Sequence, residues 1–269
     1  MTALAGWVGV DRKPSSVYLA SDSRITFPTG GIWDHGRKVF ASSRYPEVLG
    51  YCGTALFPSQ ALARVTDLID ADVLFAPFDG PGEKVNKVRQ CLKREFDQYS
   101  PADREDFTVV YCTREGEYMT STFHIAQLAC TRSCWTSKWF SMPEKSDLII
   151  NLGSGADCLS KWYGYWSRTA HKGTSRSVFS AFCDCLASGA VSTVGGPPQL
   201  VGLYRKGPAK TFGVVYKGER YVLGSRMEAS DQLSNVTWYN GAFEICDGAT
   251  MELMPAAQRH PRPNGLGHG

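Results

Sequence analysis

Near its start the chain carries TALAGWVGV at residues 2–10, followed closely by VYLASDSR (17–24), RKVF (37–40) and GYCG (50–53). Apolar residues concentrate in these stretches, and turn-forming residues such as Pro14 and Pro46 separate them, which is typical of short strands joined by turns. We expect strands at residues 3–10, 17–20, 38–41 and 48–52. Polar residues at the ends of these strands would then gather at one edge of the structure.

The rest of the chain alternates between helical and strand patterns. Apolar residues recur at helical spacing from Ala55 to Ile69 and again within residues 83–99. Further strands are expected at 107–112, 118–125, 148–152, 200–204, 211–216 and 220–223, and further helices at 156–166 and 175–190. Runs of strands followed by runs of helices favour packed antiparallel sheets with helices outside them, not a βαβ array.

Composition excludes several classes of protein. The 269 residues are 43% hydrophobic and 20% charged, as in an ordinary globular protein, and the formal net charge is only +3. Such a small charge, with no basic block interleaved with aromatic residues, argues against nucleic-acid binding. No apolar run approaches the roughly 18 residues of a membrane span. We therefore expect neither a nucleic-acid nor a membrane partner.

The nine cysteines indicate the compartment. We find no basic region before an apolar stretch at the N-terminus, and so expect no signal peptide. Without secretion, the cysteines are expected to be reduced thiols of a cytoplasmic protein. Neither their spacing nor that of the five histidines matches a metal site, so no metal is expected.

If Met1 is removed, Thr2 becomes the N-terminal residue and gains a free α-amino group. An N-terminal threonine carries a nucleophile, its hydroxyl, and a base, its own α-amino group. The amine titrates near about pH 7.7–8.0 in model compounds, so a useful fraction is neutral at cellular pH. Threonine at position 2 is common, however, and the interpretation depends on the residues around it.

Asp22, Lys38 and Gly53 are suitable companions for this nucleophile. A lysine beside Thr2 would lower the pKa of the amine and favour the alkoxide, and a carboxylate would have to hold that lysine. Asp22 and Lys38 are placed at neighbouring strand ends that could supply this pair. Gly53 could donate a backbone N–H to the oxyanion, or could simply form a tight bend. Arg24 is expected to pair with a carboxylate near the site.

These motifs resemble a known family. Threonine after Met1, ASDSR (20–24), KV (38–39) and GYCG (50–53) before a helix resemble the N-terminal-nucleophile hydrolases of the proteasome β-subunit type, and most of all its bacterial members. GSG (153–155) and VGG (194–196) are similar to the family's Gly-Ser-Gly and Ser-Gly-Gly. The resemblance is strong over roughly the first 60 residues and patchy to position 223.

The resemblance implies a fold and an assembly. The fold would be of the α+β class, a four-layer αββα sandwich of two packed antiparallel sheets with helices on both outer faces. Residues 1–225 would form the hydrolase domain, 226–253 a C-terminal extension, and 254–269 a disordered tail. The family assembles into homo-oligomeric rings that cleave peptide or unfolded-protein substrates, and a separate ATP-dependent unfoldase is a candidate partner. No metal or organic cofactor is implied.

The catalytic residues predicted on this basis are Thr2, Asp22, Lys38, Gly53 and Ser154. Ser154 could alternatively serve only to cap the helix expected from Ala156.

The chain departs from the family in one place. Where the family has a serine before the second Gly-Gly and an aspartate three residues earlier, this chain has Val194 and Val191. Both family residues hydrogen-bond around the threonine amine, and Ser192 and Thr193 are the nearest substitutes.

The sequence thus predicts a cytoplasmic N-terminal-threonine peptidase that acts through an acyl-enzyme on Thr2. Two alternatives stay open: an amidohydrolase that uses the same N-terminus on a small amide, and a ring-forming scaffold subunit without catalysis.

Overall fold

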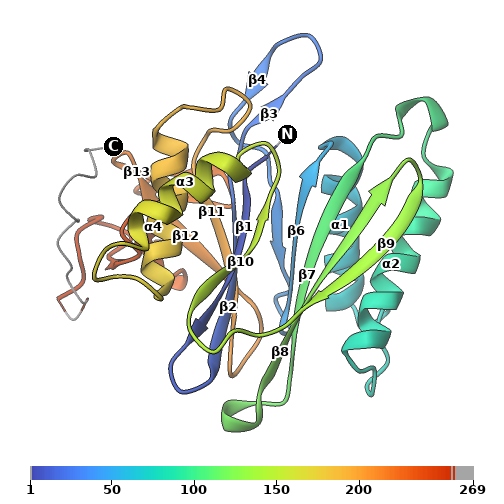
Figure 1. The fold of residues 1–269 in the computed structure, drawn as a ribbon, viewed down its shortest axis with the longest axis horizontal. Helices are drawn as coiled ribbons and strands as arrows, with labels where there is room; N and C mark the ends of the chain where they lie inside the picture. The colour runs from blue at the N-terminus through green and yellow to red at the C-terminus, as the bar shows by residue number, and fades with distance from the viewer. Residues whose placement is uncertain (1, 256, 258–269) are drawn as a thin grey trace.

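A computed structural model describes residues 2–255 and 257 of the chain (Figure 1). The strands are β1 (Leu4–Val10), β2 (Pro14–Ser21), β3 (Ile25–Thr26), β4 (Ile32–Trp33), β5 (Val39–Ala41), β6 (Glu47–Gly53), β7 (Phe107–Glu115), β8 (Thr122–Thr131), β9 (Cys134–Phe140), β10 (Asp147–Leu152), β11 (Gln199–Tyr204), β12 (Lys210–Tyr216), β13 (Glu219–Val222), β14 (Ser225–Met227), β15 (Trp238–Asn240) and β16 (Ile245–Cys246). The α-helices are α1 (Leu56–Asp70), α2 (Pro81–Gln98), α3 (Ala156–Trp166) and α4 (Ser175–Ala187), and three short 3-10 turns are η1 (Pro101–Asp103), η2 (Tyr118–Thr120) and η3 (Leu233–Asn235).

The strands of the described residues form three sheets. The first has nine strands in the order β10-β1-β2-β11-β12-β13-β14, with β15 paired to β12 and β16 paired to β15. The second has five strands, β5-β6-β7-β8-β9, and the third is the two-stranded hairpin β3-β4. Neighbouring strands are antiparallel except for β12 and β15, which run parallel.

Apolar clusters show how these elements pack. Trp7, Phe179 and Phe182 belong to a cluster in which α3 and α4 lie against the nine-stranded sheet. Leu62 and Leu92 belong to a second cluster, in which α1 and α2 lie against the five-stranded sheet. A third cluster joins side chains from the two larger sheets. Figure 1 shows the two helix pairs on opposite sides of the molecule, with the larger sheets between them.

The expected fold, a four-layer αββα sandwich built of two antiparallel sheets, is wrong, because the described residues form three sheets and include strands that no helix covers. The structure is mostly antiparallel sheet, 34% strand against 26% helix, and it contains three sheets and four α-helices in the described residues. The physical reason lies in segments outside the helix-covered cores. Leu233, Trp238 and Cys246 form a fourth apolar cluster with strand and loop residues and with no α-helical residue. The hairpin β3-β4 stands away from the larger sheets (Figure 1).

The sequence located the long elements better than the short ones. Helix α3 has the predicted bounds, while α4 ends at Ala187, three residues earlier than expected. Strand β9 (Cys134–Phe140) was not predicted, and it forms the edge of the five-stranded sheet. Most of its residues are exposed, so it lacks the apolar pattern by which strands are recognised.

Residues 226–253 extend the nine-stranded sheet through β14, β15 and β16. They therefore pack on the same sheet as the segment before residue 225. The expected disordered tail, 254–269, falls largely outside the described residues.

A buried ion pair joins the five-stranded sheet to α2. Glu47 is fully buried, and its Oε1 accepts hydrogen bonds from Lys84 Nζ at 2.7 Å and from Thr113 Oγ1 at 3.0 Å. The Tyr111 hydroxyl donates to its other oxygen. Burial raises the pKa of Glu47, and the Lys84 ammonium opposes that rise. Because the folded-state pKa lies above the unfolded one, the contribution of this group to stability falls as the pH rises through the folded value.

We predict that Lys84→Met destabilises the fold most at alkaline pH. There Glu47 would be a buried, unpaired carboxylate, and the free energy of unfolding should fall by about 3 kcal/mol at about pH 8. Near about pH 4.5 Glu47 can take up a proton, so the loss should be clearly smaller. Urea unfolding at both pH values measures the effect. Lys93→Met, which breaks an exposed pair with Asp97, is the control and should cost at most about 1 kcal/mol at either pH. Equal losses for Lys84→Met at both pH values would contradict the assignment.

Candidate functional site

The carboxylate of Asp22 lies at the centre of the candidate site. It follows β2, is fully buried and accepts four hydrogen bonds. Its Oδ1 accepts from Lys38 Nζ at 2.8 Å and from the backbone N–H of Ala3 at 3.0 Å. Its Oδ2 accepts from the backbone N–H groups of Gly195 at 3.1 Å and Arg24 at 3.2 Å. One carboxylate thus joins the start of the chain, the segment before β5 and the loop before β11.

Lys38 supplies a buried positive charge to this centre. Its side chain is 1% exposed, and it enters the site from the residue just before β5. Burial lowers the pKa of Lys38, and Asp22 opposes that shift by charge attraction and hydrogen bonding. Because Lys38 Nζ and the Ala3 amide share one oxygen of Asp22, the ammonium lies close to the residue that follows Thr2.

Thr2 is held by the loop that opens α3. It is 1% exposed, and its nitrogen donates to Ser154 Oγ at 3.2 Å. Its carbonyl oxygen accepts from the backbone N–H of Gly155 at 3.2 Å. Ser154 Oγ in turn lies 3.0 Å from Thr193 Oγ1. The N-terminal end of α3 is therefore directed at Thr2, and after removal of Met1 its positive dipole end would favour a neutral amine there.

Two glycines allow this close approach. A Cβ on Gly153, whose φ is +89°, would lie 2.0 Å from the carbonyl oxygen of Thr2. A Cβ on Gly155 would lie 2.6 Å from the Cβ of Ala3. The Gly-Ser-Gly sequence is thus a consequence of packing the loop directly against the first residues of the chain. The N-cap position of α3 is Gly155, not Ser154, and the Ser154 hydroxyl accepts from Thr2.

The structure places Gly53 at the end of β6, in a backbone conformation with φ of +109°. A Cβ there would lie 2.6 Å from the carbonyl oxygen of Asp106, so close packing against the start of β7 is sufficient reason for a glycine. Its role as an oxyanion donor stays a prediction. The hydrogen bonds above join Thr2 to Ser154, and join Asp22 to Lys38 and to Ala3, the residue after Thr2.

Arg24 pairs with a carboxylate, as predicted. Its guanidinium makes a two-pronged contact with Asp34, through Nε at 2.7 Å and Nη2 at 2.8 Å. Its Nη1 donates to the carbonyl oxygen of Ser192 at 2.9 Å. Arg24 therefore ties the hairpin β3-β4, which Asp34 follows, to the loop before β11.

Gln199 is a site residue that the sequence interpretation missed. Its Oε1 accepts from the backbone N–H of Lys38 at 3.0 Å, and its Nε2 donates to the carbonyl oxygen of Gly36 at 2.7 Å and to Ser23 Oγ at 2.9 Å. It is fully buried. The available signal was a single polar residue at the start of the otherwise apolar strand QLVGLY.

Val191 and Val194 occupy the loop where the family carries an aspartate and a serine. Val194 is buried, and its backbone N–H donates to the carbonyl oxygen of Val191 at 3.0 Å. Their side chains cannot hydrogen-bond, and the hydroxyl that reaches Ser154 comes from Thr193.

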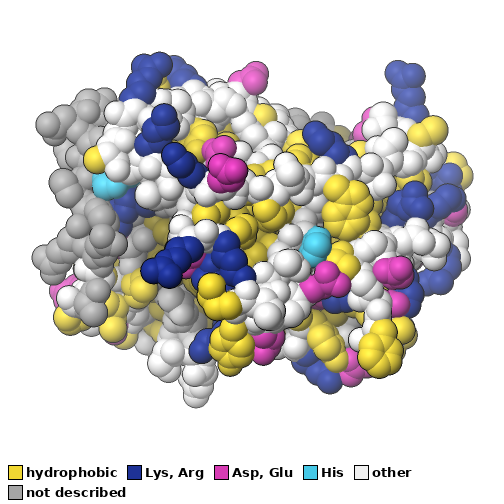
Figure 2. Space-filling model, turned by 60° about the horizontal axis from the view of Figure 1, so that its bottom comes forward, with side chains coloured by type: hydrophobic (Ala, Val, Ile, Leu, Met, Phe, Trp, Pro, Cys, Tyr) yellow, Lys and Arg dark blue, Asp and Glu magenta, His cyan; other side chains and the backbone are white. Residues whose placement is uncertain are grey.

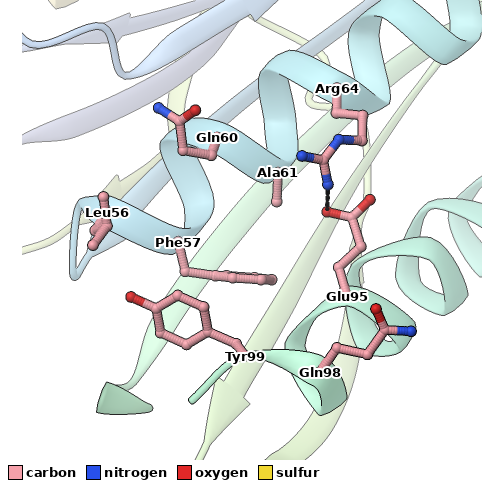
Figure 3. A pocket seen from close by; sticks show the side chains of 8 residues that line it. All are labelled: Leu56, Phe57, Gln60, Ala61, Arg64, Glu95, Gln98 and Tyr99. Atoms are coloured by element: carbon pink, nitrogen blue, oxygen red, sulfur yellow. Dashed lines mark hydrogen bonds and ion pairs between the residues drawn. The ribbon is translucent and has the colours of Figure 1, made fainter.

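Other features of the surface lie apart from this site. A groove of about 330 Å³ runs between α1 and α2 and is lined by Leu56, Phe57, Gln60, Ala61, Arg64, Glu95, Gln98 and Tyr99 (Figure 3). An ion pair of 2.9 Å between Arg64 and Glu95 crosses it. None of these residues takes part in the hydrogen bonds around Asp22. On the face seen in Figure 2, side chains of both charges are scattered among apolar and neutral ones.

Within the described residues, no cluster of three or more His, Cys, Asp or Glu could hold a metal ion. No helix in that part of the chain has the length and apolar character needed to cross a membrane.

No protein-family model matches the chain, and a comparison with curated proteins gives no match either. The resemblance described above therefore rests on the residues of this chain.

We predict that the charges of Asp22 and Lys38 are strongly coupled in stability. Asp22→Asn should lower the free energy of unfolding by about 3–5 kcal/mol, because Lys38 becomes a buried ammonium without a counter-charge. The double variant Asp22→Asn/Lys38→Met should lose less than the sum of the two single variants, since it leaves no unpaired charge. Denaturant unfolding of the wild type, Asp22→Asn, Lys38→Met and the double variant gives the four free energies of this double-mutant cycle. Strictly additive losses would mean that the two side chains do not interact as described.

Proposed function

We propose that this chain is an N-terminal-threonine hydrolase that cleaves peptide bonds through an acyl-enzyme on Thr2. The observation that carries the proposal is the arrangement at the start of the chain. Thr2 is hydrogen-bonded to Ser154, while the next residue shares a carboxylate oxygen of Asp22 with the ammonium of Lys38. Thr2 supplies a hydroxyl and a nitrogen that becomes an amine when Met1 is removed. Ser154 accepts a hydrogen bond from that nitrogen, and the Lys38 ammonium is held beside the next residue, Ala3.

Before the reaction, removal of Met1 turns the Thr2 nitrogen into a free amine. The neutral amine takes the proton of the Thr2 hydroxyl, and the oxygen attacks the carbonyl carbon of the substrate. The ammonium then gives its proton to the leaving amine as the peptide C–N bond breaks. This leaves an ester on Thr2. The same amine next activates a water molecule, whose attack breaks the ester and restores the hydroxyl.

The surrounding groups favour each charge that develops. The Lys38 ammonium lowers the pKa of a nearby amine and stabilises a negative oxygen, and the N-terminal end of α3 acts in the same direction. Asp22 holds Lys38 in place through a 2.8 Å hydrogen bond. The backbone N–H of Gly53 is the predicted donor to the oxyanion of the tetrahedral intermediate.

Processing is the precondition for this chemistry. In the chain that still bears Met1, the Thr2 nitrogen belongs to a peptide bond and cannot act as a base, and Thr2 is 1% exposed. We predict that the mature protein begins at Thr2, which intact-mass measurement and N-terminal peptide mapping can determine. Retention of Met1 in all purified protein would contradict the mechanism for that protein.

Substitutions at Thr2 and Lys38 should distinguish the contribution of the Thr2 hydroxyl to hydrolysis from that of the Lys38 ammonium. Thr2→Ala should preserve the fold and abolish peptide hydrolysis, while Thr2→Ser should keep partial activity because a hydroxyl and an amine remain. Lys38→Ala should reduce turnover by about 10²–10⁴-fold, in the range typical of a positioned acid–base group. Lys38→Arg should not restore it, because a planar guanidinium does not fit the site of a compact ammonium.

The measurement is hydrolysis of a peptide library, with folding of each variant checked by circular dichroism. Lys84→Ala is the matched control, since it removes a lysine from the Glu47 ion pair outside this site. Wild-type hydrolysis by both Thr2→Ala and Lys38→Ala would mean that neither residue carries catalysis.

A scaffold subunit without catalysis is the second candidate, favoured by the apolar side chains at Val191 and Val194. That candidate predicts normal assembly and no hydrolysis by the processed wild type. The same library, compared with small amides, distinguishes a peptidase from a small-amide hydrolase.

The proposal includes a cytoplasmic location, assembly into a homo-oligomeric ring, and polypeptide substrates that a separate ATP-dependent unfoldase could deliver. Light scattering should give a mass well above the 29.6 kDa of one chain. A monomer at micromolar concentration would contradict the ring.

A further inference from the structure

We propose that the hydroxyl of Thr193 is a positioning group that fixes Ser154 as a hydrogen-bond acceptor for the Thr2 amine. This role rests on the function proposed above, and it assigns the task to a residue outside the catalytic set predicted from the sequence.

Three polar groups form a short chain that ends at the nucleophile. The Thr2 nitrogen donates to Ser154 Oγ at 3.2 Å, and Ser154 Oγ lies 3.0 Å from Thr193 Oγ1. A serine hydroxyl has one proton and two lone pairs. Because one lone pair of Ser154 accepts from Thr2, its proton is available for Thr193. With that proton directed at Thr193, Ser154 presents only lone pairs to Thr2.

The loop that carries Thr193 is held on both sides of this residue. Arg24 Nη1 donates to the carbonyl oxygen of Ser192 at 2.9 Å. On the other side, the backbone N–H of Gly195 donates to Asp22 Oδ2 at 3.1 Å, and the carbonyl oxygen of Gly195 accepts from Ser23 N–H at 3.0 Å. The loop is thus held by Asp22, which also binds Lys38 and the Ala3 amide, and by Arg24, whose backbone N–H donates to Asp22.

Packing limits which side chain can supply the hydroxyl. Val194 is 4% exposed, and a Cβ on Gly155 would lie 3.2 Å from its Cγ2, so this apolar side chain fills the space beside the Gly-Ser-Gly loop. Ser192 is exposed and is held through its backbone carbonyl. Within residues 191–195, Thr193 is therefore the residue whose side chain hydrogen-bonds to Ser154.

The consequence for catalysis follows from the direction of the hydrogen bonds. An acceptor beside the amine stabilises the ammonium that forms when the amine takes a proton. Without Thr193, the Ser154 hydroxyl can rotate and donate its proton to the amine lone pair. That lone pair would then be less available for the Thr2 hydroxyl, and the neutral amine would be stabilised, so its pKa would fall.

The test uses Thr193→Val, which keeps the shape of the side chain but removes the hydroxyl, and Thr193→Ser, which restores it. Ser192→Ala is the matched control, because it removes a hydroxyl from the same loop and leaves the carbonyl that Arg24 contacts. Each protein is prepared with Thr2 as its first residue by cleavage of a removable leader. The pKa of the ¹⁵N-labelled Thr2 amine is measured by NMR titration, and kcat and KM for a fluorogenic peptide are measured against pH.

We expect Thr193→Val to lower the pKa of the Thr2 amine by about half a unit to one unit, which is the scale of one hydrogen bond. Its kcat should fall by about 10-fold, at the lower end of acid–base effects, with little change in KM. Thr193→Ser should return both values to near wild type, and Ser192→Ala should match wild type throughout.

An unchanged amine pKa in folded Thr193→Val would overturn the positioning role, even if the wild type cleaves peptides. A shifted pKa that Thr193→Ser restores, in a protein that cleaves no peptide, would support the positioning role and contradict the proposed function instead. A shift of equal size in Ser192→Ala would also overturn it, because the effect would then belong to the loop as a whole.

Discussion

The buried ion pair between Lys38 and Asp22 is the interaction on which the site depends. Removing two such charges from water costs several kcal/mol per ion, and the attraction between them offsets this only when the remaining hydrogen-bonding capacity is satisfied. Here Asp22 accepts from three backbone N–H groups in addition to Lys38. The Arg24 amide is local, but Ala3, Lys38 and Gly195 come from other segments of the chain, so the fold must bring them together before the pair is stable.

Because the buried pair needs further hydrogen bonds, many of the contacts in the site are made by backbone amides. The amides of Ala3 and Gly195 bind Asp22, and the amide of Gly155 binds the carbonyl oxygen of Thr2. Backbone groups hold polar atoms in place without the entropy loss of ordering long side chains. Thr2 is therefore held through its backbone nitrogen and carbonyl oxygen, and its side-chain hydroxyl can be changed without removing those contacts.

The sequence grouped Thr2, Asp22, Lys38 and Ser154, and it indicated that a carboxylate holds Lys38, but it did not indicate Gln199 or the contact between Ser154 and Thr193. Strand ends placed Asp22 and Lys38 near Thr2, and the similarity of GSG (153–155) to the family's Gly-Ser-Gly pointed to Ser154. Gln199 was not predicted, and Thr193 was named only as a substitute near the threonine amine and not as a partner of Ser154, because both contacts depend on loop conformation. The fold was predicted less well. Helices α1 to α4 have clear periodicity, whereas strands of two or three residues such as β3 and β16 have too few side chains to show one. Those short strands, together with β9, make the molecule richer in sheet than the expected sandwich.

In the proposed mechanism the Thr2 hydroxyl and the Thr2 amine act together beside Lys38. Treatment of the processed protein with a peptide epoxyketone, followed by intact-mass measurement and peptide mapping, tests it most directly, since this reagent needs both an oxygen and a nitrogen nucleophile on one residue. The account predicts one adduct per chain, located on Thr2, absent from Thr2→Ala and formed much more slowly by Lys38→Ala. No adduct on folded, processed wild-type protein, or an adduct on any other residue, would contradict it.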